Sequence, residues 1–280
     1  LDEGESITTL MPLPEDEESW GELSVMFATA SGGARRNSLS DFTNVKANGK
    51  IAMKLGDDDQ LIGVQACSET DDILLSSRNG KCIRFPVTDV RVFSSRSSTG
   101  VRGIRLDGDD KVISMSVLSH VKAEISERDE YLQSVSASRR LAGGDYSDRP
   151  EDKVQDESRA ERLNEALFAE MGENEEFILT LADDGIGKRT SAYEYRISKR
   201  GGKGIASIDL KRPKGQATSV VGSFPVETDD QLVMVSDGGQ LIRCPVAGIS
   251  VVGRSSRGVT IFNVADKERV VSVSRLNDDD

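Results

Sequence analysis

Gly80-Lys81-Cys82-Ile83-Arg84-Phe85-Pro86-Val87 decides the fold of this chain, because its pattern returns as Gly239-Gln240-Leu241-Ile242-Arg243-Cys244-Pro245-Val246. Both segments follow an apolar strand pattern and precede an Arg/Ser-rich stretch that ends in a Gly turn. Both copies then close on a Val/Ile-rich segment, at 112–118 and 270–276. Self-similarity of this kind indicates stacked structural repeats.

A second pair of copies, at 25–64 and 177–221, follows the same plan with a shorter middle. The copies therefore alternate short, long, short, long, and residues 7–10 are typical of the last strand of an earlier copy. Four short strands in about 45–55 residues is the size of one propeller blade. A lone blade cannot bury both of its faces, so neighbouring blades must stack. The sequence thus predicts an all-β propeller or pinwheel of four-stranded blades, and a β-sandwich would not explain the repeat.

Residues 119–172 interrupt the repeats. Apolar residues at near-helical spacing predict two charged helices here, separated by a Gly- and Asp-rich linker at 143–150. We interpret the segment as an acidic, partly disordered insertion, and favour a solvated spacer over a partner-binding element. The expected organisation is one pinwheel domain. It consists of 1–118 (the end of one blade and two complete blades), the insertion at 119–172, and 173–280 (two further blades with an acidic tail).

The charge is unevenly distributed. The net charge of −12 argues at first against nucleic acid, because phosphate repels an acidic surface. However, residues 1–22, 119–176 and 278–280 together carry −19, so the remaining 197 residues carry +7. A basic body with acidic appendages is a charge asymmetry that predicts an anionic partner. We also hypothesise that the acidic segments compete with such a partner for the basic body.

No enzyme signature is present in the sequence. His120 is the only histidine, and Cys67, Cys82 and Cys244 are isolated, which is typical of reduced thiols in a cytosolic protein and not of a metal site. The carboxylates cluster in turns such as 57–59 and 183–184, where Asp satisfies turn backbones. No apolar run is long enough to cross a membrane. We expect no catalytic residue, no metal and no cofactor, and Leu1 suggests a cut within a longer protein.

Cations recur at matching positions of the copies and predict a positive track for duplex DNA, bound by its backbone without base specificity. Few aromatic residues are present, which argues against stacking of single strands. The Gly- and Lys-rich loop at 198–204 lets the backbone approach a phosphate closely. The candidate DNA-binding residues are Arg35, Arg36, Lys46, Lys50, Lys81, Arg84, Arg91, Arg96, Arg102, Arg105, Lys188, Arg189, Arg196, Lys199, Arg200, Gly201, Gly202, Lys203, Gly204, Arg243, Arg254 and Arg257.

These residues together resemble the C-terminal domain of the DNA gyrase A subunit, which is part of a type IIA topoisomerase. The resemblance rests on the repeated Gly-x-x-Ile-Arg-x-Pro-Val pattern, on residues 98–104 and 237–243, and on Arg200-Gly201-Gly202-Lys203-Gly204. It implies a six-bladed β-pinwheel whose blades exchange strands and which wraps duplex DNA. It also implies ATP-dependent negative supercoiling by an assembly of two A and two B subunits, in which ATP and Mg are used outside this chain. The implied location is the cytoplasm, in association with the nucleoid.

The family's seven-residue box, Gln-Arg/Lys-Arg-Gly-Gly-Arg/Lys-Gly, marks the first blade. Here its nearest match, Ser198–Gly204, lies in the third complete copy and has Ser198 in place of Gln. We therefore expect the first blade, with the true box, to lie upstream of Leu1. Two alternatives stay open at this point: the C-terminal domain of the related topoisomerase IV subunit, which lacks the box, and a propeller that binds proteins.

Overall fold

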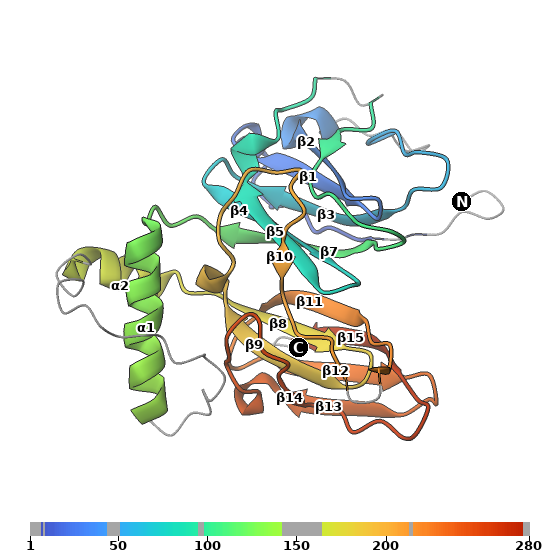
Figure 1. Cartoon of the computed structure of the whole chain (residues 1–280). Coiled ribbons are helices and arrows are strands. Elements are labelled where there is room, and N and C mark those ends of the chain that lie inside the picture. Colours follow the sequence, from blue (N-terminus) through green and yellow to red (C-terminus); the bar gives the residue numbers. More distant parts are fainter. Residues whose placement is uncertain are drawn as a thin grey trace. The chain divides into compact units, whose positions relative to one another are not determined.

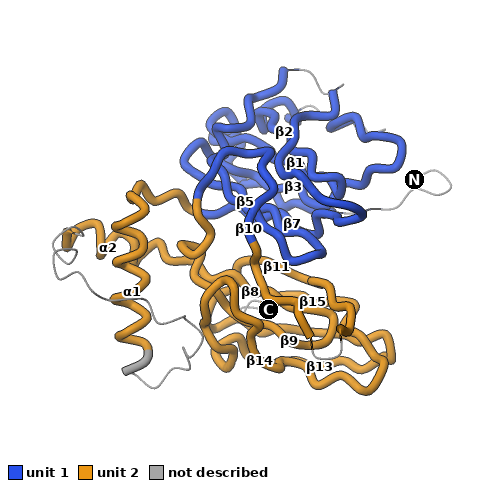
Figure 2. The backbone as a smooth tube through the Cα atoms, viewed as in Figure 1, with its two compact units in different colours: residues 1–118, 197–205 blue, residues 119–196, 206–280 orange. Residues whose placement is uncertain are grey.

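The computed structural model describes residues 7, 9–43, 51–94, 98–141, 164–212 and 215–276. The chain divides into two compact units, which Figure 2 shows in blue and orange. Unit 1 comprises residues 1–118 and 197–205, and unit 2 comprises residues 119–196 and 206–280. Among the described residues, no helix is long and apolar enough to span a membrane.

The first sheet of unit 1 is built mainly by the first copy. Its strands are β1 (Ser24–Thr29), β2 (Gly33–Ser38), β3 (Leu61–Cys67) and β6 (Val101–Arg102), in the order β3-β1-β2-β6. All pairings are antiparallel. Every residue of β1 is buried, as expected for the strand next to the centre of a blade.

The second sheet has the same plan. Its strands are β4 (Asp71–Ser77), β5 (Lys81–Pro86), β7 (Val112–Ser119) and β10 (Ile205–Ala206), in the order β10-β5-β4-β7. The motif that opened the sequence analysis is therefore β5, the second strand of this copy. Figure 1 shows β10, coloured orange by its position in the sequence, beside β5 in this sheet.

Unit 2 contains the third and fourth sheets. The third has the order β11-β8-β9-β14, formed by β8 (Phe177–Ala182), β9 (Ile186–Ser191), β11 (Val220–Val226) and β14 (Val259–Thr260). The fourth has three described strands in the order β13-β12-β15. These are β12 (Gln231–Ser236), β13 (Leu241–Pro245) and β15 (Val270–Leu276).

Short 3-10 turns recur with the repeats. One turn follows the second strand of every copy: η2 (Leu39–Phe42), η3 (Val87–Asp89), η5 (Ala192–Glu194) and η7 (Val246–Gly248). A further one, η1 (Glu17–Gly21), precedes β1. The four copies predicted from the sequence are thus four structural repeats, and the predicted propeller or pinwheel class is confirmed.

Neighbouring copies exchange strands in one direction. The two-residue strands β6, β10 and β14 each come from one copy and complete the sheet of the preceding copy; we name them crossing strands. A glycine with positive φ precedes each of them: Gly100 (90°), Gly204 (69°) and Gly258 (92°). A Cβ at these glycines would lie 2.5, 2.3 and 2.3 Å from a backbone oxygen of the receiving sheet. Only glycine fits this approach.

Each unit has its own apolar core. In unit 1, Met26, Ile73, Leu75 and Phe85 are wholly buried and pack together between the first and second sheets. In unit 2, the largest cluster includes Leu179, Leu181, Leu232, Met234 and Phe262. Complete burial of each such side chain contributes about 1.5–3 kcal/mol. The repeat is therefore stabilised by contact between successive sheets, as expected for blades that cannot bury both faces alone.

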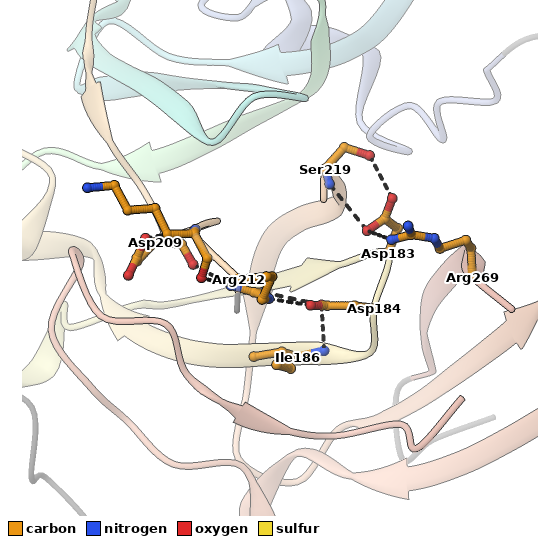
Figure 3. A network of polar contacts seen from close by, with 8 residues as sticks. Asp183, Asp184, Ile186, Asp209, Arg212, Ser219 and Arg269 are labelled. Carbon is orange, nitrogen blue, oxygen red and sulfur yellow. Dashed lines mark hydrogen bonds and ion pairs between the residues drawn. The ribbon is translucent and has the colours of Figure 1, made fainter. Parts of the chain in front are cut away.

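Carboxylates hold the hairpin turns, as the sequence predicts for 57–59 and 183–184. Figure 3 shows this network at the turn between β8 and β9. Asp183 accepts hydrogen bonds from the backbone N–H (3.2 Å) and the hydroxyl (3.1 Å) of Ser219, and pairs with Arg269 at 3.1 Å. Asp184 accepts from the N–H of Ile186 at 3.2 Å and pairs with Arg212. Arg212 and Arg269 are therefore engaged in structure.

The insertion contains the two predicted helices, α1 (Ile125–Leu141) and α2 (Glu165–Glu173). Their described parts are not a solvated spacer, which corrects our interpretation. Tyr131, Leu132, Met171 and Tyr193 form a small buried cluster that joins both helices to η5, directly after β9. The hydroxyl of Tyr193 donates to the Met171 carbonyl at 3.0 Å. The linker expected at 143–150 lies outside the described residues.

The strand expected at 7–10 is a second correction. Residues 7, 9 and 10 belong to no strand, and the side chains of Ile7 and Leu10 are 68% and 85% exposed. Among the described strands, none pairs with residues 7, 9 or 10. Local propensity for a strand is decided by pairing and burial, which are missing here.

Candidate nucleic-acid interface

The cations proposed from the sequence fall into three groups. Lys46, Lys50 and Arg96 lie outside the described residues. Five are buried: Arg35, Arg36, Arg84, Lys188 and Arg189. The others are exposed or half-buried: Lys81, Arg91, Arg102, Arg105, Arg196, Lys199, Arg200, Lys203, Arg243, Arg254 and Arg257. The second-strand cations were expected on the DNA-facing surface, and for the buried five that placement is wrong.

Three of the buried arginines occupy one register position in their sheets. Arg36, Arg84 and Arg189 lie opposite Met26, Leu74 and Leu179. Each forms a parallel bridge with a segment of the next copy, at Val92, Ile197 and Val251 respectively. The residue after each bridge donates its N–H to the arginine carbonyl at 2.8–2.9 Å. The backbone of the next copy is thus fixed beside the strand at each of these buried arginines.

The guanidinium groups of Arg36, Arg84 and Arg189 have partners within the fold. Arg84 pairs with the wholly buried Asp72 at 2.8 Å. Arg36 donates to the Ser24 hydroxyl at 2.9 Å and to Glu69 at 2.6 Å. Arg189 donates to the carbonyl of Ile249 at 2.8 Å. Buried charges are retained only with such partners, so these three arginines serve the structure of the sheets and are not exposed to a phosphate.

The loop Ser198–Gly204, which we name the box-like loop, belongs to unit 1 and directly precedes β10, an edge strand of its second sheet. The N–H of Ser198 donates to the Arg84 carbonyl at 2.9 Å. The N–H of Gly201 donates to the Gly103 carbonyl, and the N–H of Arg105 donates to the Gly202 carbonyl at 2.8 Å. The box-like loop is therefore fastened to the segment 102–105 of the second copy, and their cations are brought together.

Arg200 anchors the box-like loop through hydrogen bonds to the second copy. Its Nε donates to the Asp89 carbonyl at 2.8 Å, and its Nη1 donates to the Arg102 carbonyl at 3.0 Å. Its backbone N–H donates to the Asp89 carboxylate at 3.2 Å. Much of its donor capacity is thus used internally. Lys199 and Lys203, on either side of it in sequence, remain exposed.

The charges of three exposed cations, Lys203, Arg105 and Lys81, act on a single carboxylate, Asp107. Lys203 Nζ lies 3.0 Å from Asp107 Oδ1, and both side chains are more than half exposed. The hydrogen bond from Lys203 lowers the pKa of Asp107, and the charges of Lys203, Arg105 and Lys81 lower it further. A group of cations that attracts one carboxylate can also attract the oxygens of a phosphate diester. We name Lys81, Arg105 and Lys203 the cation cluster.

In unit 2 the equivalent loop follows the fourth copy's motif. Arg254 is half-buried, with its Nε 3.2 Å from the Glu194 carbonyl and its Nη1 donating to the Ala206 carbonyl. Arg257, directly before Gly258, is exposed. Arg196 is exposed as well. Arg243 lies on β13, at the register position of the buried arginines, but here the described chain provides no crossing strand and the side chain is exposed.

Comparison with known proteins shows that this architecture of repeated, strand-exchanging sheets occurs in a known protein family. Four segments, 24–68, 71–119, 176–213 and 230–277, match the family described as "DNA gyrase C-terminal domain, beta-propeller". They coincide with the four copies and together cover well over half of the chain.

The chain belongs to the DNA gyrase C-terminal domain family.

The relatives agree with this assignment. The chain is 47% identical over 276 residues to the DNA gyrase A subunit of Rickettsia bellii, covering 97% of this chain and 29% of that protein. Against the DNA gyrase A subunit of Escherichia coli K12 the identity is 33% over 276 residues, covering 99% of this chain and 25% of that protein. The chain thus spans less than a third of the length of the curated relatives it matches.

Solved structures share the fold. A structure of the DNA gyrase A C-terminal domain has a TM-score of 0.62 at 21% identity and covers 91% of this chain and 66% of the other. The C-terminal domain of DNA topoisomerase IV has a TM-score of 0.66 at 15% identity, covering 92% and 63%. These likenesses concern the fold alone, whereas the family match and the relatives favour gyrase over the topoisomerase IV alternative.

Two features of this candidate interface were not found from the sequence. The first is Asp107, the carboxylate inside the cation cluster, because its lysine partner is 96 residues away in the chain. The second is Arg78, an exposed cation in the turn between β4 and β5, which is not part of the recurring motif. The inward orientation of the second-strand arginines was missed for a similar reason, since the covering segments belong to the next copy.

Proposed function

We propose that this chain binds duplex DNA through the phosphate backbone, without sequence specificity, and serves as the DNA-wrapping module of a gyrase A subunit. The observation that supports the proposal best is the cation cluster beside the box-like loop, joined by exposed Lys199 and Arg102. Equivalent exposed cations, such as Arg257, lie beside the crossing strand of the fourth copy. Backbone-directed binding needs cations of this kind at regular intervals and no base-reading groups.

Wrapping requires many contacts because DNA is stiff. Bending a site of 20–30 base pairs by 40–90° costs about 1–6 kcal/mol. Cations that recur with each repeat can offset this cost along a continuous duplex. In the holoenzyme that we propose, two A and two B subunits use ATP and Mg outside this chain, and the wrapped segment is supercoiled negatively. The chain itself then contributes no catalytic residue, and its location is the cytoplasm with the nucleoid.

The direct test is the salt dependence of duplex binding. Fluorescence anisotropy with a labelled duplex would be measured from low to high salt for the natural chain and for the triple variant Lys81→Ala/Arg105→Ala/Lys203→Ala. Each lost phosphate contact reduces the slope of log K against log salt by about 0.9. The slope of log K against log salt is therefore expected to be less steep by about 2.7 in the triple variant.

Two results would contradict the proposal. Affinity of the natural chain that barely changes with salt would exclude backbone binding. A slope in the triple variant equal to that of the natural chain would exclude contact between the cation cluster and DNA phosphates. The matched control is Lys122→Ala, an exposed lysine outside the crossing segments, for which the slope is expected to stay unchanged. A supercoiling assay with the complete A and B subunits, with and without the triple variant, then tests the role in the holoenzyme.

A further inference from the structure

Two buried cations occupy equivalent positions in the first and third sheets. Arg35 lies opposite Phe27 on β1, and Lys188 lies opposite Thr180 on β8. Both side chains are wholly buried. The equivalent positions of the second and fourth sheets hold Ile83 and Ile242, so the cation is a feature of the short copies.

Both cations bind the backbone of the loop that leads to the next crossing strand. Lys188 Nζ donates to the carbonyls of Gly253 (2.8 Å), Ser256 (3.0 Å) and Arg254. Arg35 Nη1 donates to the carbonyl of Ser98 and, at 2.6 Å, to its hydroxyl. Ser98 and Ser256 correspond to each other, because each stands two residues before a crossing glycine, Gly100 or Gly258.

The loops held in this way carry exposed cations. Arg257 follows Ser256 directly, and Arg102 lies four residues after Ser98. The carbonyls that Lys188 binds face inward, and without a donor there they would have to turn toward water. The position of Arg257 on the surface therefore depends on the buried ammonium group beneath it.

We propose that Arg35 and Lys188 are positioning residues of the DNA interface, which fix the crossing loops of the next copy from inside the sheet and do not touch phosphate themselves. The proposal rests on the proposed function, since it assigns a role in the same interface. It also gives the short copies a distinct task, which is to hold the Arg/Ser-rich loops of the long copies.

The test replaces Lys188 by methionine, an unbranched apolar side chain of similar length, and measures duplex binding of the full chain against salt. Lys188→Met is expected to reduce the slope of log K against log salt by about 0.9, the value expected for Arg257→Ala. The double variant is expected to lose the same single contact, and not two. Lys188→Arg, which has the group found at Arg35, is expected to restore the natural slope.

The controls distinguish failure of the positioning role from failure of the proposed function. Ile242→Met, at the same register position of the fourth sheet, is expected to leave the slope unchanged. Hydrogen exchange is expected to rise in Lys188→Met at 253–259 while β8 and β9 stay protected, which distinguishes a loosened loop from an unfolded unit. Additive losses in the double variant, a natural slope in Lys188→Met, or general loss of protection would overturn the positioning role. Absence of DNA binding by the natural chain would instead overturn the proposed function.

Discussion

Replacement of Gly204 by alanine is expected to detach the crossing strand of the third copy. Gly204 has φ +69°, and a Cβ there would lie 2.3 Å from the carbonyl oxygen of Cys82 on β5. A non-glycine residue in this left-handed conformation costs about 1–2 kcal/mol. The overlap with a backbone oxygen cannot be relieved by a side-chain rotation, so the strand must move.

The movement has a further cost. The box-like loop is held by hydrogen bonds that include Ser198 N–H to the Arg84 carbonyl and Arg105 N–H to the Gly202 carbonyl. Each such bond contributes about 0.5–1.5 kcal/mol, and the loss of two adds about 1–3 kcal/mol. We therefore expect Gly204→Ala to lower the free energy of unfolding of unit 1 by about 2–5 kcal/mol.

The same loop provides the matched control. Gly202 has no positive φ, and a Cβ there would meet Ile83 Cδ1 at 3.6 Å, an ordinary contact. Gly202→Ala is therefore expected to change the unfolding free energy by less than about 0.5 kcal/mol. Urea unfolding gives the free energies, and hydrogen exchange at 197–206 and on β5 locates the change. Equal losses in the two variants, or none in Gly204→Ala, would refute the argument from backbone approach.

Three further predictions concern single acids and a thiol. Asp72→Ala removes the buried carboxylate that pairs with the buried Arg84 and should cost about 3–5 kcal/mol in urea unfolding. Glu69→Ala, whose carboxylate is 70% exposed, should cost less than about 1 kcal/mol. Equal costs in the two variants would contradict the role of burial. Asp107→Asn should strengthen duplex binding about two- to five-fold, because it removes a negative charge from the cation cluster. This gain should be the same at pH 6 and at pH 8, because the hydrogen bond from Lys203 holds the pKa of Asp107 below its ordinary value, so the carboxylate stays ionised over this range. The same gain in Asp109→Asn would show a general effect of charge only. Burial raises the pKa of Cys67 to about 12, so the thiolate needed for alkylation is scarce at pH 8. Mass spectrometry should therefore detect alkylation of Cys67 by iodoacetamide only when urea unfolds the chain. Prompt alkylation of Cys67 in the folded protein would contradict this prediction.

The repeat architecture is accessible from the sequence because each copy carries its own signals. The motifs at 80–87 and 239–246 became β5 and β13 with the turns that end them. Glycines such as Gly100 and Gly258 were visible as turns, although their reason, the approach to a neighbouring carbonyl, is not local. Periodicity also located both helices of the insertion.

The orientation of the cations could not be read in the same way. Alternation along a strand places Arg84 on one face of the sheet, but the segment that pairs with it, at Ile197, is more than a hundred residues distant. The sequence shows charge, and burial depends on what the next copy places over it. For the same reason the pairing of Lys203 with Asp107 depends on the fastening of two loops that are far apart in the chain.

Because strands are exchanged in one direction only, the array of blades has a defined direction along the chain. Among the described strands, the second, third and fourth copies each give a crossing strand to the copy before them, so each of the first three blades is completed by its successor. Deleting a later copy would therefore open the edge of the blade that precedes it, while deleting the earliest copy would take no strand from those that follow. A duplicated copy brings both its own donor strand and its own acceptor edge. Such an array can be extended by an added copy whose crossing strand would pair with the exposed β13 of the fourth sheet.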